Sequence, residues 1–213
     1  MQATASRQPY FIGLTGNIAT GKSTALAFLA EKGAHIADAD KLAHRTMIPD
    51  GPAYEKVVAA FGPEIVDENG LIDRAKLGAI VFADAEALKR LEAIVHPATF
   101  ELLRWDIMQS NAKVVVVEAI KLFESGNLMS LSDEVWVVAA SPETQMKRLV
   151  EERGMSEAEA RQRIAAQGPQ EDKIARADVV IVNDGALEEF YAQLEAAWAQ
   201  VEKKLATRQL TNG

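Results

Sequence analysis

The 213-residue sequence predicts a three-layer α/β/α fold, in which a five-stranded parallel sheet lies between two layers of helices. Five short runs rich in β-branched and apolar residues alternate with segments of helical spacing, as expected when helices connect parallel strands. Four consecutive valines at 114–117 predict a strand buried on both faces. A glycine-rich segment between the first strand and the first helix is the third observation, because this arrangement is typical of phosphate-binding α/β proteins.

The elements follow from the same patterns along the chain. Strands are expected at residues 10–15, 34–38, 113–120, 133–140 and 177–183. Residues 22 to about 32 have helical spacing and end before a glycine. A mostly helical segment follows the second strand, and Asp73 and Asp84 stand where N-caps are expected. Within this segment Pro97 is expected to begin a new helix.

These elements predict how the chain is divided. We expect a nucleotide-binding core at residues 8–41 and 112–206, with a lid at about 142–170 that contains two charged helices meeting near Gly154. Residues 42–111 are interpreted as a helical insertion carried on this core. A last amphipathic helix is expected from 187 to about 205, followed by a flexible tail at 207–213.

Composition narrows the class of protein. The net charge is −8 and no dense basic stripe occurs, which argues against general nucleic-acid binding. The first ten residues lack an apolar core of signal-peptide length, and no apolar run is long enough for a membrane span. The absence of cysteine fits a reducing compartment. We therefore expect a cytoplasmic protein without nucleic-acid or membrane partners. We also expect small-molecule substrates and a monomer or small homo-oligomer.

The segment GLTGNIATGKST contains the phosphate-binding loop (P-loop) pattern GxxxxGK[ST], with Gly16, Gly21, Lys22 and Ser23 at the fixed positions. A strand precedes the pattern and a helix follows it, as the pattern requires. The glycines permit a backbone path whose N–H groups converge on phosphate oxygens. Lys22 can reach the β- and γ-phosphates, and Ser23 can ligate Mg²⁺. The sequence therefore predicts a site for a magnesium-bound nucleoside triphosphate.

Acidic side chains follow two of the predicted strands. Glu118 ends the third strand, where it can hold Mg²⁺ through water or can act only as a structural carboxylate. Asp38 and Asp40 follow the second strand, and ligands of open parallel sheets lie beyond the carboxyl ends of the strands. A carboxylate there can accept the proton of an attacking hydroxyl. The alternative is an N-cap of the next helix, and one aspartate can cap while the other acts on substrate.

Several segments occur in the order found in dephospho-CoA kinases, and the chain resembles that family from residue 10 to about 190. The segments are GLTGNIATGKST, DAD, FG, LIDRAKL, VF, HP, VEAIKLFESG, SPETQMKRL, RIAAQ and ADVVIVNDG. The resemblance implies the P-loop NTPase fold of nucleoside-monophosphate-type kinases, with a helical substrate-binding insertion and a lid. It also implies ATP and Mg²⁺ as cofactors, and transfer of a phosphoryl group to the ribose 3′-hydroxyl of dephospho-CoA in the last step of coenzyme A synthesis.

The resemblance further implies roles for individual residues. Asp40 corresponds to the general base, and Arg148 lies in the lid, where the family supplies an arginine to the transferring phosphate. Thr15 and Asp38 are expected near the reacting groups. The ATP-binding positions are Gly16, Ala19, Thr20, Gly21, Lys22, Ser23 and Thr24, with Asn183 and Gly185 bordering the adenine. The positions associated with the CoA substrate are Asp73, Arg74, His96 and Pro97.

Three loop positions depart from the family's common GGIGSGKS, because Asn17, Ala19 and Thr20 stand in place of Gly, Gly and Ser. They are variable positions of the pattern, so we expect tolerated variation, although Ala19 must accept the backbone angle of the glycine. Lys121 and Arg153 have no role that the resemblance assigns.

Other interpretations stay open at this stage. The chain can be a different P-loop kinase, of a nucleoside or nucleotide, or a nucleotide-binding regulator without transfer activity. The LIDR and HP segments favour the CoA enzyme, and the intact Lys22, Ser23 and Asp40 argue against a regulator. The lack of an NKxD segment argues against a GTPase. His96 can equally cap a helix, and the charged run of the lid can equally be a solvated helix face.

Overall fold

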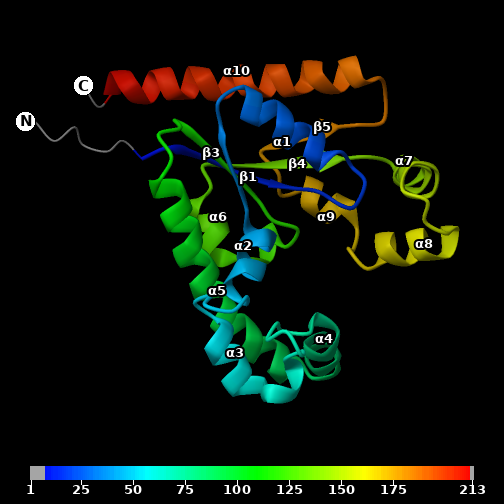
Figure 1. The fold of residues 1–213 in the computed structure, drawn as a ribbon. Coiled ribbons are helices and arrows are strands. Elements are labelled where there is room, and N and C mark those ends of the chain that lie inside the picture. The colour runs from blue at the N-terminus through cyan, green and yellow to red at the C-terminus, as the bar shows by residue number, and fades with distance from the viewer. Residues whose placement is uncertain (1–7, 212–213) are drawn as a thin grey trace, which may run out of the picture. The chain divides into compact units, whose positions relative to one another are not determined.

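The structure is a computed structural model that describes residues 8–211, and it contains a five-stranded parallel sheet (Figure 1). The strand order is β2-β3-β1-β4-β5. The central strand β1 pairs in parallel with β3 and β4, and β4 pairs in parallel with β5. The strands are β1 (Tyr10–Thr15), β2 (His35–Asp38), β3 (Val114–Glu118), β4 (Glu134–Ala139) and β5 (Val179–Val182). The predicted fold class and all five predicted strands are confirmed.

Helices cover both faces of this sheet. On one face, α1 (Lys22–Glu31) and α10 (Leu187–Thr211) pack against alternate side chains of the strands (Figure 1). Helix α6 (Gly126–Leu131) contacts β1, and α9 (Gln170–Ile174) contacts β4. An apolar core lies between the strands and the helices α1 and α10. Trp136 belongs to this core and is the largest fully buried side chain among the described residues. All five residues of β3 are buried, so the valine run lies inside the sheet as its composition predicted.

The chain separates into two compact units, one made of residues up to Ile36 together with those from Ala112 onward, the other of Ala37–Asn111. The second unit has its own apolar core, which includes the fully buried Val57 and Ile65. Its helices are α2 (Ala39–Thr46), α3 (Tyr54–Phe61), α4 (Arg74–Ala83) and α5 (Ala85–Met108). Short 3₁₀ turns lie at Pro63–Ile65 in this unit and at Leu122–Glu124 in the first.

The predicted break at Pro97 is wrong, because α5 continues through it from Ala85 to Met108. A proline inside a helix removes one backbone hydrogen bond and crowds the preceding turn. Here the apolar side chains of Val95 and Leu103, on either side of Pro97, are buried in the same helix, and this packing outweighs the local cost. The expected N-caps are confirmed: Asp73 caps α4 and Asp84 caps α5 through side-chain oxygens.

The last helix is also longer than predicted. Helix α10 runs to Thr211, so the tail expected from residue 207 is helical over most of its length, and residues 212–213 lie outside the described part. Arg208 explains the extension, because its guanidinium forms an ion pair with Asp133 and lies 4.6 Å from the ring centroid of Tyr10. None of the helices within residues 8–211 combines the length and apolarity that crossing a membrane requires.

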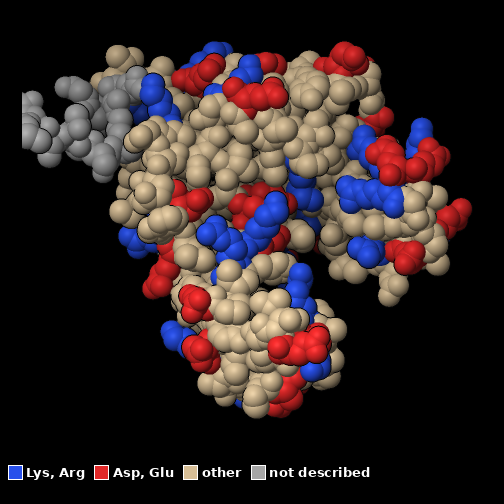
Figure 2. Space-filling model, in the orientation of Figure 1, with Lys and Arg blue, Asp and Glu red and all other residues tan. Residues whose placement is uncertain are grey.

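Between β4 and β5 the chain forms α7 (Pro142–Lys147), a π-helical turn at Arg148–Glu152 and α8 (Glu157–Ala165). The two α-helices meet near Gly154, which adopts a φ of 66° that glycine tolerates best. On the face drawn in Figure 2, acidic and basic side chains are intermingled over these helices. This segment is the region predicted as a lid.

Candidate active site

The P-loop connects β1 to α1, and its two fixed glycines are required by close contacts. A Cβ at Gly16 would lie 2.3 Å from the carbonyl oxygen of Val138 on the neighbouring strand. At Gly21 a Cβ would lie 2.1 Å from Nδ2 of Asn183, and its φ of 104° is one that other residues rarely adopt. No side chain fits at either position without moving backbone or a buried amide.

Lys22 turns back over the loop that precedes it. Its Nζ donates hydrogen bonds to the carbonyl oxygens of Gly16 at 2.8 Å and Asn17 at 3.1 Å. Ser23 and Thr24 lie in the first turn of α1, so their backbone N–H groups belong to the positive end of the helix dipole. This arrangement places an ammonium group and helix N–H groups around one turn of backbone, the geometry that binds phosphate anions.

Ala19 links the loop to the lid. It has a φ of 58° and is buried against Leu149 and Ala160 of the lid segment. Arg148 adds polar contacts, since its Nη1 donates to the carbonyl oxygen of Ala19 at 3.0 Å and its Nη2 to that of Asn183 at 2.9 Å. Arg148 therefore joins the loop to the segment after β5. Its contact with a transferring phosphate stays a prediction.

The segment after β5 packs on the loop. Asn183 is buried, and its Nδ2 donates to the carbonyl oxygen of Thr20 at 2.8 Å. Gly185 lies in the bend that follows, before α10. Burial acts to raise the pKa of Asp184, but hydrogen bonds from the N–H and hydroxyl of Ser141 and the hydroxyl of Thr144 outweigh it and hold the pKa below its ordinary value. These contacts fix the segment that we expect beside the adenine.

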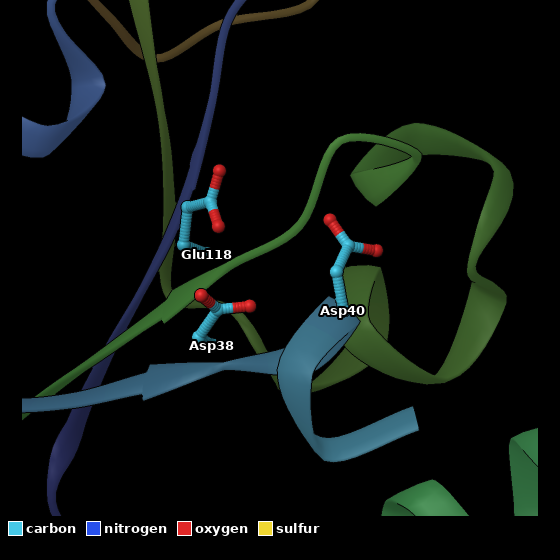
Figure 3. Close-up of side chains that lie close together, drawn as sticks. All are labelled: Asp38, Asp40 and Glu118. Carbon is cyan, nitrogen blue, oxygen red and sulfur yellow. The ribbon is translucent and has the colours of Figure 1, made fainter. Parts of the chain in front are cut away.

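Three carboxylates form the acidic part of the site. Asp38 ends β2, Glu118 ends the adjacent strand β3, and Asp40 lies in the first turn of α2 (Figure 3). One oxygen from each carboxylate lies within 4.8 Å of the other two. Asp38 accepts a hydrogen bond from the N–H of Lys41 at 2.9 Å, so it is the N-cap of α2. Capping therefore occupies the first aspartate of DAD and not Asp40.

Three hydrogen bonds of the loop were missed by sequence reasoning. The Oδ1 of Asn17 accepts a hydrogen bond from Nζ of Lys173 at 2.6 Å, and its Nδ2 donates to the carbonyl oxygen of Gly168 at 3.2 Å. The N–H of Ile18 donates to Oε1 of Gln167. Asn17, which stands in place of the family's glycine, thus makes hydrogen bonds that a glycine side chain cannot make. Its sequence signal is a polar side chain at a position that glycine commonly fills.

The remaining predicted residues are placed as follows. Thr15 is buried at the end of β1, where its hydroxyl donates to the carbonyl oxygen of Ile120. Asp73 uses Oδ1 to cap α4, and Arg74 is the first residue of that helix. His96 and Pro97 are exposed on α5. The interpretation of His96 as a helix cap is wrong because α5 does not end there. Substrate contacts of these residues stay predictions.

The sheet, the P-loop, the strand-end carboxylates and the lid segment together define the class of P-loop kinases that act on small molecules. The family model described as dephospho-CoA kinase matches residues 10–189. A dephospho-CoA kinase of Geobacillus kaustophilus is 48% identical over 198 residues, which are 90% of this chain and 98% of the relative. The chain belongs to the dephospho-CoA kinase family.

Solved structures agree with this assignment. A Thermus thermophilus protein superposes with a TM-score of 0.80 at 38% identity and covers 91% of this chain and 98% of its own. The dephospho-CoA kinase of Campylobacter jejuni has a TM-score of 0.67 at 29% identity, with 92% and 99% covered. The matched regions therefore include both the nucleotide-binding unit and the helical unit.

Proposed function

We propose that the protein transfers the γ-phosphoryl group of ATP to the ribose 3′-hydroxyl of dephospho-CoA and so forms coenzyme A. The observation that carries this proposal is the acidic cluster at the ends of β2 and β3 in a chain with an intact P-loop. The loop accounts for the triphosphate, and a carboxylate of the acidic cluster accounts for a hydroxyl acceptor. Membership of the dephospho-CoA kinase family supports dephospho-CoA as that acceptor.

The reaction is a direct in-line displacement. Asp40 accepts or orients the proton of the 3′-hydroxyl as the oxygen bonds to the γ-phosphorus. The bond from that phosphorus to the β–γ bridging oxygen breaks, and ADP leaves. Lys22 neutralises negative charge on the phosphates, which is electrostatic preorganisation. Asp38, held as the cap of α2, fixes the turn from which Asp40 projects.

The donor set also fits magnesium. Carboxylate oxygens and a serine hydroxyl are ligands that Mg²⁺ prefers, and the oxygens of Asp38, Asp40 and Glu118 lie within 4.8 Å of one another. We assign the ion to Ser23 and Glu118, which would hold it, and the ion would offset negative charge on the phosphates. Asp40 is the carboxylate that we assign to the substrate proton.

The product identifies the reaction. Protein, ATP, MgCl₂ and dephospho-CoA are incubated together, and mass spectrometry with fragmentation locates the added phosphate on the 3′-hydroxyl. A protein that phosphorylates nucleosides or nucleotides but not dephospho-CoA would contradict the proposal. ATP hydrolysis without any phosphorylated acceptor would contradict it as well.

Asp40→Asn tests the assignment of the base. We expect kcat to fall by about 10²–10⁴-fold, the range that general-base catalysis supplies, with ATP affinity retained. Asp50→Asn is the matched control, because Asp50 is exposed and has a φ of 66° that asparagine tolerates. Turnover of Asp40→Asn at the control's rate would refute the role of Asp40.

A further inference from the structure

Lys173 contacts the P-loop but has no role in the proposed reaction so far. It belongs to α9, which follows the lid segment, and its Nζ donates to Oδ1 of Asn17 at 2.6 Å. Asn17 is only 2% exposed and also donates to the carbonyl oxygen of Gly168. The contact is therefore built on a buried side chain with both of its polar atoms in use.

The electrostatic setting of Lys173 is unusual for a lysine. Its side chain is partly buried, and the loss of hydration lowers its pKa, while the charge of Glu124 raises it only in part. Within residues 8–211, Lys173 has no carboxylate in ion-pair distance, and its hydrogen-bond acceptor is a neutral amide. Holding an ammonium group there costs free energy unless an anion compensates the charge.

The place of Lys173 along the loop indicates which phosphate of the nucleotide can compensate its positive charge. Lys22 also contacts Asn17, through the carbonyl oxygen, so two ammonium groups lie against one loop residue. In P-loops the lysine marks the β- and γ-phosphates, whereas backbone N–H groups cradle the α- and β-phosphates. Lys173 therefore lies at the γ-phosphate end of the loop. A phosphate there would separate the two ammonium groups and relieve their repulsion.

We propose that Lys173 is a second phosphate-binding lysine, which contacts the γ-phosphoryl group of ATP during its transfer, and that Asn17 is the positioning residue that aims it. The inference rests on the proposed function, because it gives the lysine a task in that reaction. Charge on the equatorial oxygens is the main quantity that a phosphoryl-transfer site must stabilise. Lys173 adds a cation to the one supplied by Lys22.

The decisive variant is Lys173→Gln, compared with Lys173→Arg and the control Lys203→Gln. Lys203 is an exposed lysine of α10, so its variant removes the same charge far from the loop in sequence. We expect Lys173→Gln to lower kcat by about 10- to 100-fold, below the full effect of a buried transition-state donor because the side chain is partly exposed. Lys173→Arg keeps the charge and recovers part of the rate.

Nucleotide affinities identify the phosphate concerned. Calorimetric titration of Lys173→Gln should show ATP affinity falling about tenfold while ADP affinity changes less than twofold. Equal losses for ATP and ADP would overturn the assignment to the γ-phosphate. Wild-type kcat and ATP affinity in Lys173→Gln would overturn the proposal as a whole.

Asn17→Gly tests positioning. If Asn17 acts through Lys173, Asn17→Gly lowers kcat without changing KM for dephospho-CoA, and combining it with Lys173→Gln costs no more than Lys173→Gln alone. Additive losses in the double variant would overturn the positioning role. Circular dichroism melts of each variant separate these effects from loss of fold.

The wild-type protein supplies a test that needs no variant. Amine acylation followed by peptide mass spectrometry measures the reactivity of Lys173 with ATP or ADP bound. Stronger protection by ATP supports the proposal, and equal protection contradicts it. This readout is independent of the acceptor, so a protein that makes no coenzyme A but protects Lys173 with ATP refutes only the proposed acceptor.

Discussion

Ala19 departs from the glycine of the family pattern, and the effect of this departure on the free energy of unfolding can be measured. It has a φ of 58°, in the left-handed region that glycine adopts without cost. The residue is also buried, at 6% exposure, against Leu149 and Ala160 of the lid segment. Ala19→Gly therefore removes backbone strain and lid packing at the same time.

The two effects of Ala19→Gly nearly cancel. An L-residue in the left-handed conformation costs about 1–2 kcal/mol, which glycine relieves. The buried methyl contributes about 0.8 kcal/mol, and glycine's freedom in the unfolded chain costs about 0.4–1 kcal/mol. The free energy of unfolding should therefore change by less than about 1 kcal/mol. At about 2–4 °C per kcal/mol for a chain of this size, Tm moves by no more than about 4 °C.

Ala19→Val should destabilise the fold, because it increases both the backbone strain and the crowding at this position. A β-branched residue is less tolerant of positive φ, and extra methyl groups in a packed cluster cost about 1–3 kcal/mol. We expect a Tm about 2–12 °C below that of the wild type. Thermal unfolding followed by circular dichroism measures both variants. The matched control is Ala27→Gly, an exposed helical position of α1 where glycine costs about 0.5–1 kcal/mol with no strain to relieve.

Two results would refute this reasoning. One is Ala19→Gly losing over 1 kcal/mol more than Ala27→Gly, which would mean that lid packing dominates. The other is Ala19→Val unfolding at the wild-type temperature.

Three further predictions concern other parts of the chain. Gly21→Ala should weaken ATP binding at least tenfold, because its Cβ would lie 2.1 Å from Nδ2 of Asn183; unchanged affinity in calorimetry would contradict this. Ile65→Ala should cost about 2–5 kcal/mol in urea unfolding, since Ile65 is fully buried in the helical unit; a loss below about 1 kcal/mol would show that the cavity collapses. Asp184 has a lowered pKa, so its carboxylate stabilises the fold above about pH 4 and this contribution is lost as pH falls through the lowered pKa. Asp184→Asn should therefore be less stable than wild type at pH 7, by a difference that shrinks below pH 4; a constant difference would contradict the linkage.

The sheet could be predicted from sequence because all of its strands except β2 contain continuous apolar runs. In β3 and β4 every residue is buried, and such runs have few alternative conformations. The errors fall where tertiary contacts override a local rule. Pro97 is tolerated because buried side chains on both sides of it belong to one apolar stripe. Residues after Leu205 stay helical because Arg208 pairs with Asp133, which precedes β4 and is 75 residues away in sequence.

The site could be predicted from sequence where a short sequence motif assigns the role of a residue. The P-loop glycines fall in this group, since their close contacts follow from the pattern itself. Spacing alone could not tell which of Asp38 and Asp40 is the N-cap, and only the backbone geometry assigns the cap to Asp38. The Asn17–Lys173 contact lay outside sequence reasoning, because the two residues are 156 positions apart.

The variable positions of the loop connect it to both ends of the lid segment. Ala19 packs against Leu149 near its beginning, whereas Asn17 and Ile18 bond to Gly168 and Gln167 at its end. A nucleotide that moves the loop must change these contacts, and by linkage a lid held in one position must change nucleotide affinity. We therefore expect substitutions in the loop to affect the predicted lid even where they leave the phosphate-binding pattern intact. Asn17 and Ala19, which differ from the family's glycines, are the loop residues whose side chains contact this segment.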